Sequence, residues 1–129
     1  MKMAYAAWTK GSAALLLSVF ALAEHHGLGE SLQEEWGLSQ PVLKNKLDGA
    51  ALGNAPKAWR FVGEMQQIAQ TLSDAGQNPG AFESAAEIYQ AMAGFKSSEA
   101  DSITTEAVIR SILKASMNAN SGNESQDKS

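Results

Sequence analysis

The longest apolar stretch of the chain lies within its first 27 residues and supports two incompatible interpretations. As a secretory signal peptide, it has Lys2 and Lys10 in a basic leading region, an apolar run over residues 13–23, and Ala21-Leu22-Ala23 as a cleavage site. As a permanent helix, it makes about seven turns and ends at Gly27. A membrane span is not expected, because a span needs about 20 largely apolar residues.

We favour the permanent helix. Residues 8–12 make an unusually long lead-in for a signal peptide, and Glu24-His25-His26-Gly27 continues and then closes a helix. The chain has no cysteine, which excludes a disulfide-stapled domain and says nothing about export. We therefore expect a cytoplasmic protein with no membrane partner, and an exported helical protein that loses residues 1–23 is the alternative.

Size and charge narrow the possible classes of protein. With 129 residues, the chain can form one domain around a single core. Its net charge is −4, and no cluster of basic residues is dense enough to dock on a phosphate backbone. No nucleic-acid partner is expected.

Apolar residues follow the helical period almost everywhere, and no alternating run is long enough for a strand. We predict an all-α, multi-helix domain around a long central N-terminal helix over residues 2–26. Shorter helices are predicted over residues 30–36 and from Ser39, as its cap, to Gly49. Residues 50–54 are predicted to be a connector.

The second half of the chain should contain three more helices. One starts at Asn54 and Pro56 and ends at Gly76, with one apolar stripe at helical spacing. The next follows Asn78 and Pro79 and stops at Gly94, and the last is capped by Ser102. The stripe consists of Phe61, Met65, Ile68 and Leu72.

We divide the chain into a helical domain over residues 1–96, an additional C-terminal helix over 97–117 and a disordered tail over 118–129. The tail has too few apolar residues to offset the conformational entropy that ordering it would cost. Four aromatic side chains are expected in the core. They are Trp8, Trp59, Phe61 and Tyr89.

Lysines at the start of the first helix are the first candidates for chemistry. Lys10 lies about 80° around the helix axis from Lys2, so one side of the helix can present two ammonium groups to an anionic ligand. An ammonium withdrawn from water has a lowered pKa, which suits it to general acid/base catalysis. The plainer interpretation is that both lysines extend from a buried helix to water.

A second candidate is the sequence Lys57-Ala58-Trp59-Arg60. Lys57 and Arg60 share a helix face with Glu64 and are able to grip a carboxylate or phosphate. An ordinary Arg60–Glu64 ion pair on a solvated face is the plainer account. His25 and His26 point 100° apart on a helix and have no further ligand at workable spacing, so no metal site is expected.

The opening segment, together with KAWRFVGEM (57–65) and AAEIYQAMAGF (85–95), resembles the C-terminal helical domain of NAD-binding phosphogluconate dehydrogenase-like proteins, in the β-hydroxyacid dehydrogenase superfamily. The resemblance covers residues 2–96, and KMAYAAWTKGSAALL is its most specific part. It implies a substrate-side and dimer-forming domain of an NAD(P)-dependent oxidoreductase that acts on a small anionic hydroxy acid. A homodimer is therefore expected.

The resemblance also implies site residues. Lys2 falls on the lysine of the family pattern Lys-x-x-x-Asn and would act as general acid/base, with Tyr5, Lys10, Lys57 and Arg60 binding substrate. Ala6 replaces the family asparagine, and Tyr5 beside it offers a hydroxyl instead.

NAD or NADP would bind only through a separate Rossmann domain, because no glycine-rich fingerprint occurs in this sequence. The chain alone is not expected to be an active enzyme. A non-enzymatic helical interaction domain, which has kept the fold and lost the chemistry, is the other hypothesis.

Overall fold

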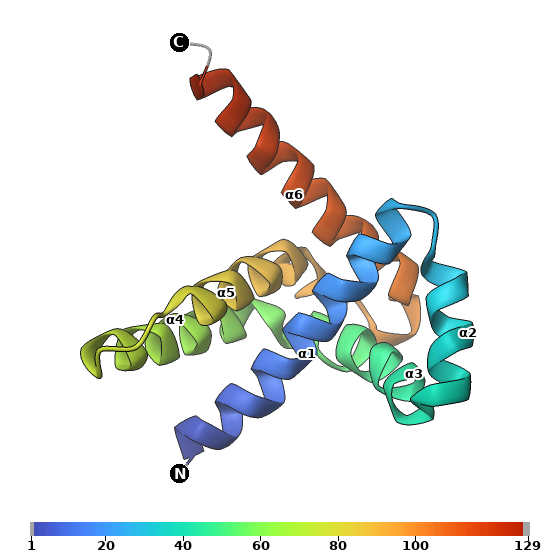
Figure 1. The fold of residues 1–129 in the computed structure, drawn as a ribbon, viewed down its shortest axis with the longest axis horizontal. Coiled ribbons are helices and arrows are strands. Elements are labelled where there is room, and N and C mark those ends of the chain that lie inside the picture. The colour runs from blue at the N-terminus through green and yellow to red at the C-terminus, as the bar shows by residue number, and fades with distance from the viewer. Residues whose placement is uncertain (1, 128–129) are drawn as a thin grey trace.

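The computed structural model describes the backbone of residues 2–127, and the side chains of residues 2–116 except residue 100. Within that range the chain is helical and has no strand, which confirms the all-α prediction. Helix α1 (Lys2–His25) crosses the middle of the molecule (Figure 1). Its buried residues are Ala14, Leu17, Phe20 and Ala21.

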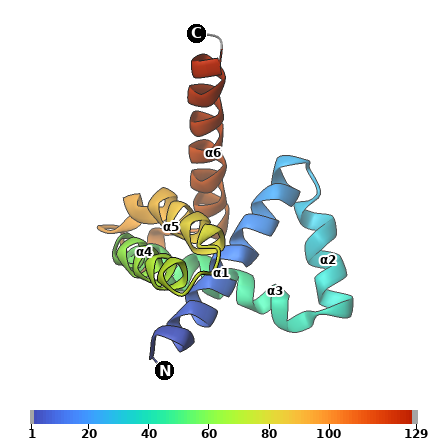
Figure 2. The same cartoon turned by 60° about the vertical axis from the view of Figure 1, so that its left-hand side comes forward.

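The remaining helices pack around α1. Helices α4 (Ala58–Asp74) and α5 (Gly80–Met92) form an antiparallel pair beside it, which Figures 1 and 2 both show. Helices α2 (Gly29–Ser39) and α3 (Pro41–Asp48) fold back along its second half. Helix α6 (Thr105–Asp127) packs on α1 and α5 and then extends away from the body.

Two glycines end helices as the sequence predicts. Gly27 has φ +71°, and the amide of Leu28 donates to the carbonyl of Ala23 at 2.7 Å. Gly76 has φ +80°, and Gln77 donates in the same way to Leu72 at 2.8 Å. Both arrangements are Schellman motifs, which need a residue in the left-handed region that glycine enters without a steric penalty. The chain therefore reverses sharply after α1 and after α4.

The two serines predicted as helix caps are not caps. The hydroxyl of Ser39 donates to the carbonyl of Glu35 within α2, so α2 runs three residues further than predicted and α3 begins at Pro41. The hydroxyl of Ser102 donates to Glu99. A serine hydroxyl can bond to the preceding turn as readily as to the next one, and the spacing alone does not decide which.

The cap of α6 is provided by Thr104 instead. Its Oγ1 accepts a hydrogen bond from the amide of Ala107 at 3.1 Å.

The predicted connector is a π-helical turn, η1 (Gly49–Gly53), followed by a short 3₁₀ turn, η2 (Ala55–Lys57). Ala50, Ala51 and Ala55 are buried, and η1 contacts both α1 and α6. Small side chains let this backbone approach two helices closely, so the segment belongs to the core and does not merely join two helices.

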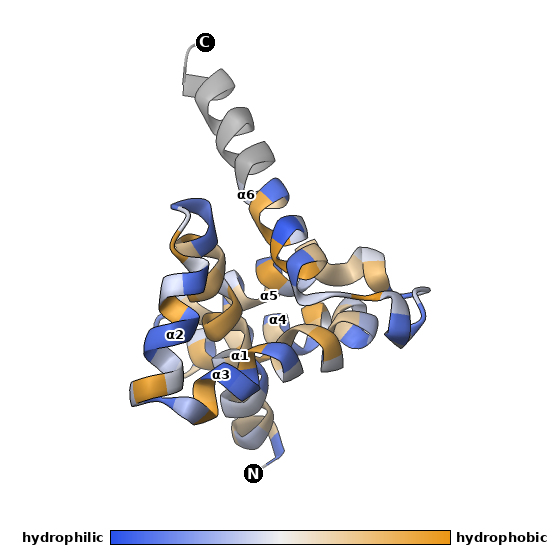
Figure 3. Cartoon of the chain, turned by 90° about the vertical axis from the view of Figure 1, so that its right-hand side faces the viewer, coloured by the Kyte–Doolittle hydropathy of each residue, from blue (hydrophilic) through white to orange (hydrophobic). Residues whose placement is uncertain are grey.

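One hydrophobic cluster unites all these elements, and Figure 3 shows by contrast that α2 is mainly hydrophilic. The predicted α4 stripe is confirmed, since Phe61, Met65 and Ile68 are buried and Leu72 packs against them. Of the residues predicted to point inward on the last helix, Ile109 and Ile112 are buried and Leu113 is partly buried.

Helix α6 joins the same cluster as the first 96 residues, and the domain boundary at 96/97 stays a prediction. The backbone of α6 is helical to Asp127, although the sequence predicts a disordered tail over 118–129. The side chains from residue 117 onward and the backbone of 128–129 lie outside the described residues.

We expect Leu17→Ala to lower the free energy of unfolding by about 2–5 kcal/mol, because it leaves a cavity where the wild-type side chain is 0% exposed. Leu38→Ala is the matched control, since that leucine is 84% exposed, and its effect should stay within about 0.5 kcal/mol. Urea unfolding followed by circular dichroism measures both. Equal effects would mean that α1 is not part of the core.

Candidate functional site

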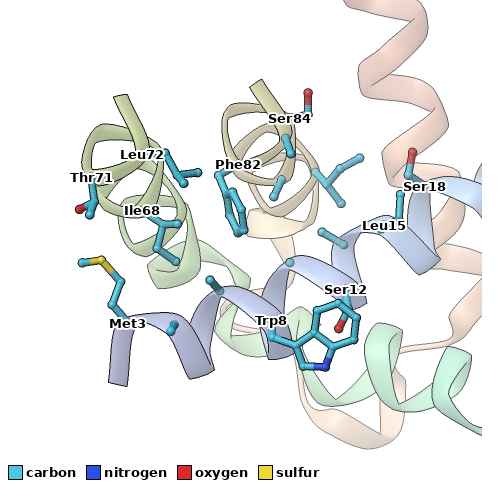
Figure 4. Close-up of a pocket in the computed structure, with 17 residues that line it drawn as sticks. Met3, Trp8, Ser12, Leu15, Ser18, Ile68, Thr71, Leu72, Phe82 and Ser84 are labelled. Atoms are coloured by element: carbon cyan, nitrogen blue, oxygen red, sulfur yellow. The ribbon is translucent and has the colours of Figure 1, made fainter. Parts of the chain in front are cut away.

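The first half of α1 forms a groove with α4 and α5, with a volume of about 880 Å³. Figure 4 shows Trp8 and Leu15 from α1, Ile68 and Leu72 from α4, and Phe82 from α5 around it. Small residues of α1 make its floor, and a Cβ built on Gly11 would come within 3.0 Å of the Phe82 ring. The small residues are Ala4, Ala7, Gly11 and Ala14.

The groove is apolar in character. Among the described residues that line it, the polar groups are the indole N–H of Trp8 and four hydroxyls, and none of these residues is charged. The hydroxyls belong to Ser12, Ser18, Thr71 and Ser84. Such a lining has no charged group to neutralise a carboxylate or phosphate and no acid or base to move a proton. The groove suits apolar side chains, and the chemistry that the sequence predicts must be sought elsewhere.

Lys10 lies where α1 meets α4 and α5. Its ammonium forms a salt bridge with Glu64 of α4 and lies 4.3 Å from the centroid of the Phe61 ring. The hydroxyl of Tyr89 on α5 donates to the backbone carbonyl of Lys10 at 2.5 Å. One residue of α1 is thus tied to both neighbouring helices.

The hydroxyl of Tyr89 has a perturbed pKa. Its side chain is fully buried, and its ring meets Phe61 edge-on with the centroids 5.4 Å apart. Burial raises the pKa of the Tyr89 hydroxyl far above its ordinary value, and the negative charge of Glu64 adds to the increase. The phenol therefore remains a hydrogen-bond donor.

Lys2 and Tyr5 occupy the exposed first turns of α1, and neither lines the groove. Lys10 lies about 12 Å further along the helix axis than Lys2, given a rise of 1.5 Å per residue. Lys10 forms a salt bridge with Glu64, whereas Lys2 lies at the exposed N-terminal end of α1, so the two lysines have different surroundings. The predicted roles of Lys2, Tyr5 and Lys10 toward a substrate stay predictions.

Arg60 lies in the first turn of α4 and Lys57 lies at the end of η2, directly before it, and both side chains are exposed. Arg60 lies 6.0 Å from the Phe61 ring on which Lys10 also sits. The ion pair of Glu64 is formed with Lys10, 54 residues away, in place of the i, i+4 pair with Arg60 that the sequence suggests. Local spacing gave no sign of this pairing, and substrate binding by Lys57 and Arg60 stays a prediction.

Two of the four aromatic residues expected in the core are not there. Phe61 and Tyr89 are buried as predicted, but Trp8 is 76% exposed and Trp59 is 45% exposed. The ammonium of Lys96 lies over the ring of Trp59, 4.0 Å from the ring centroid. This cation–π contact joins residues 37 positions apart, so helical spacing does not reveal it.

Helix α1 also meets the length and hydropathy expected of a membrane span, with a mean hydropathy of 1.4, and it is the one described helix that does. Core helices of soluble proteins and signal sequences satisfy the same test. Within the described residues, no three His, Cys, Asp or Glu side chains come together as a metal site.

A family model described as a domain of unknown function, DUF1932, matches residues 23–92, from the end of α1 to the end of α5. The match spans more than half of the chain. The chain belongs to the DUF1932 family. In known proteins a DUF1932 domain follows a dehydrogenase-like NAD-binding domain. No curated protein and no solved structure matches the chain.

The DUF1932 match leaves out residues 2–22, which carry Lys2, Tyr5 and Lys10. It includes the start of α4 with Lys57 and Arg60, and the whole of α5 with Tyr89. The α4 and α5 residues that line the groove therefore lie inside the matched segment, and the α1 residues that line it lie outside.

We expect Tyr89 to resist ionisation while the fold persists. In a Tyr5→Phe variant Tyr89 is the only tyrosine, since the chain has two, and its phenolate absorbance should be absent near pH 10, where free tyrosine ionises. Ultraviolet absorbance during a pH titration measures this. A phenolate signal from a chain that still shows its helical circular dichroism would contradict the burial.

The same shift makes stability fall in alkali. Because the pKa of Tyr89 is higher in the folded chain, the unfolded chain binds fewer protons above about pH 10, and stability decreases as pH rises beyond that point. Tyr89→Phe removes this contribution and also the hydrogen bond to Lys10, at a cost of about 0.5–1.5 kcal/mol at neutral pH. Urea unfolding of both chains between pH 8 and about pH 11 measures the difference.

Proposed function

We propose that this chain is the helical, substrate-side domain of an NAD(P)-dependent oxidoreductase of phosphogluconate or β-hydroxyacid dehydrogenase type. The observation that carries the proposal is membership of the DUF1932 family, whose domains in known proteins follow a dehydrogenase-like NAD-binding domain. The exposed lysine at the start of α1 supports it.

The residues of this chain do not suit a dinucleotide by themselves. The described residues include no strand followed by a glycine-rich turn, and the groove offers no charged group for a pyrophosphate. NAD or NADP would therefore be held by a separate Rossmann domain, and the cofactor would supply the hydride chemistry.

The contribution of this chain would come from the first turns of α1. Residues 2–5 are exposed, so a domain placed over this end would enclose Lys2 and Tyr5 together. Lys2 Nζ would then accept or return the proton of the substrate hydroxyl, and the Tyr5 hydroxyl would hydrogen-bond to the substrate. The substrate proposed is a small anionic hydroxy acid.

The basic residues at the start of α4 fit the same substrate class. Lys57 and Arg60 both reach solvent and lie outside the hydrophobic core, so they would bind the acid group. Lys10 would act mainly by fixing α1 on α4 through Glu64, and it would reach a substrate only by leaving that salt bridge.

A non-enzymatic interaction domain is the second candidate. It is favoured by the lack of charged side chains in the groove and by the exposure of Trp8 beside it. An exported protein that loses residues 1–23 is the third. It would have to do without Ala14, Leu17, Phe20 and Ala21, which α1 buries in the core.

We expect Lys2→Ala to abolish most of the catalytic activity when the chain is supplied with a dehydrogenase-like NAD-binding domain in trans. Loss of a general acid/base lowers kcat by about 10²–10⁴-fold. The assay follows NADH and NADPH absorbance with small hydroxy acids as substrates. Lys46→Ala is the control, because Lys46 is exposed on α3.

The alternatives predict other results. A lack of activity in every pairing, together with no binding of sugar acids to the chain by calorimetry, would favour the interaction domain. Sequencing the N-terminus of the native protein tests export, since a mature chain that starts at Glu24 would contradict the cytoplasmic enzyme.

A further inference from the structure

A cavity lies near the other end of α1, where its last turns meet α2, α3 and α6. Its volume is about 410 Å³, within the range of sites that bind small molecules. Phe20 and Ile109, both buried in the core, give the cavity an apolar part, to which Leu113 adds. Phe20 lies about 27 Å along the helix axis from Lys2, so this cavity is separate from the proposed reaction site.

Charged side chains of both signs line the same cavity. Glu24 lies near the end of α1, Asp48 is the last residue of α3, and Glu106 lies in the first turn of α6. Arg110 follows Glu106 by about one turn of α6. The three carboxylates and one guanidinium among the described residues that line the cavity give it a net charge of −2 at neutral pH.

Two of the carboxylates are positioned by contacts with other elements. The hydroxyl of Thr105 on α6 donates to Oδ1 of Asp48 on α3 at 2.8 Å, which holds this carboxylate beside Glu106. Glu24 lies against the backbone of Gly29, where a Cβ would collide with its carboxylate oxygen. The glycine thus leaves room for this carboxylate, and a larger residue at position 29 would displace it.

Arg110 does not pair with the carboxylates around it. Glu106 is located four residues before it, a spacing that favours an ion pair on a helix surface. Within the described residues the one salt bridge joins Lys10 to Glu64, so the guanidinium and all three carboxylates keep their charges for a ligand. Unpaired charges of both signs in one cavity distinguish it from a plain acidic patch.

We infer that this cavity binds a free basic amino acid, such as lysine or arginine. The carboxylate of the ligand would bind the guanidinium of Arg110, whose planar fork matches a carboxylate with two parallel hydrogen bonds. The side-chain cation would lie between Asp48 and Glu106, and the α-ammonium would bind Glu24. The methylene groups of the ligand would pack on the apolar part of the cavity.

Other small ligands match these charges less well. A diamine has no group for Arg110, which would repel it, and an amino acid with an apolar side chain has no second cation for the remaining carboxylates. A metal ion is not expected, because no three acidic or histidine side chains of the described residues come together as a metal site. A basic amino acid offers one anion and two cations.

Isothermal titration calorimetry of the full chain with three matched compounds tests the inference. Norleucine lacks the side-chain ammonium of lysine, and cadaverine lacks its carboxylate. We expect lysine to bind with a dissociation constant of about 0.1–1 mM, in keeping with a ligand of its size, and the other two compounds to bind about tenfold more weakly or worse. Equal binding of all three compounds, or no binding of lysine and arginine, overturns the inference.

Variants of α6 test the two ends of the ligand separately. Arg110→Gln should weaken lysine binding about tenfold and abolish the preference for lysine over cadaverine, whereas Glu106→Gln should weaken the binding of both. Lys114→Gln is the matched control, because Lys114 is exposed one turn further along α6 and does not line the cavity. All three replaced side chains are exposed, and circular dichroism confirms that the variants are folded. Lysine binding that Arg110→Gln leaves intact overturns the inference.

A peptide that ends in a basic residue presents related chemistry, and one further titration distinguishes it. Nα-acetyl-lysine keeps the carboxylate and the side-chain cation but lacks the α-ammonium. Equal affinity for this compound and for lysine would assign the cavity to the C-terminal residue of a peptide and overturn a free amino acid as its ligand. None of these measurements needs a nucleotide-binding domain or dehydrogenase activity, so the inference and the proposed function hold or fail separately.

Discussion

The burial of one side of α1 is the constraint on which the rest of the structure depends. Leu17 and Phe20 are buried in the core. Helix α1 contacts α2 and α3, the α4–α5 pair and α6, so helices from both halves of the sequence pack on it. The contacts of Lys10 fix the orientation of α1 relative to α4 and α5. Its ammonium forms a salt bridge with Glu64 of α4, and its backbone carbonyl accepts a hydrogen bond from Tyr89 of α5. Apolar burial alone is not directional, whereas a salt bridge and a hydrogen bond are.

The sequence predicts the helices well because their signals are local. The stripe from Phe61 to Ile68 and the glycines at 27 and 76 each act within one or two turns, and the structure agrees with them. The errors occur where two local outcomes are nearly equal in energy. Ser39 can bond to either neighbouring helix, and residues 49–53 coil into a π turn because the alanines there are small enough to be buried.

The site was less predictable because its contacts are distant in sequence. Glu64 has a candidate partner four residues earlier in Arg60, yet the partner it takes is Lys10 from another helix, and nothing in the spacing distinguishes the two. The exposure of Trp8 was equally hard to predict from the sequence. An apolar residue on a helix of this kind looks like core, and only the positions of α4 and α5 reveal that its side of α1 is left open.

Helix α1 would therefore serve the core and the proposed site with two different parts of its length. Lys2 precedes Ala14, the first buried residue of α1, by 12 residues, which is about 18 Å along the helix axis at 1.5 Å per residue. A nucleotide-binding domain placed over the first turns would meet the exposed residues 2–5 and leave the packing of Leu17 and Phe20 unchanged. Proton transfer at Lys2 would thus not compete with the burial that holds the helices together.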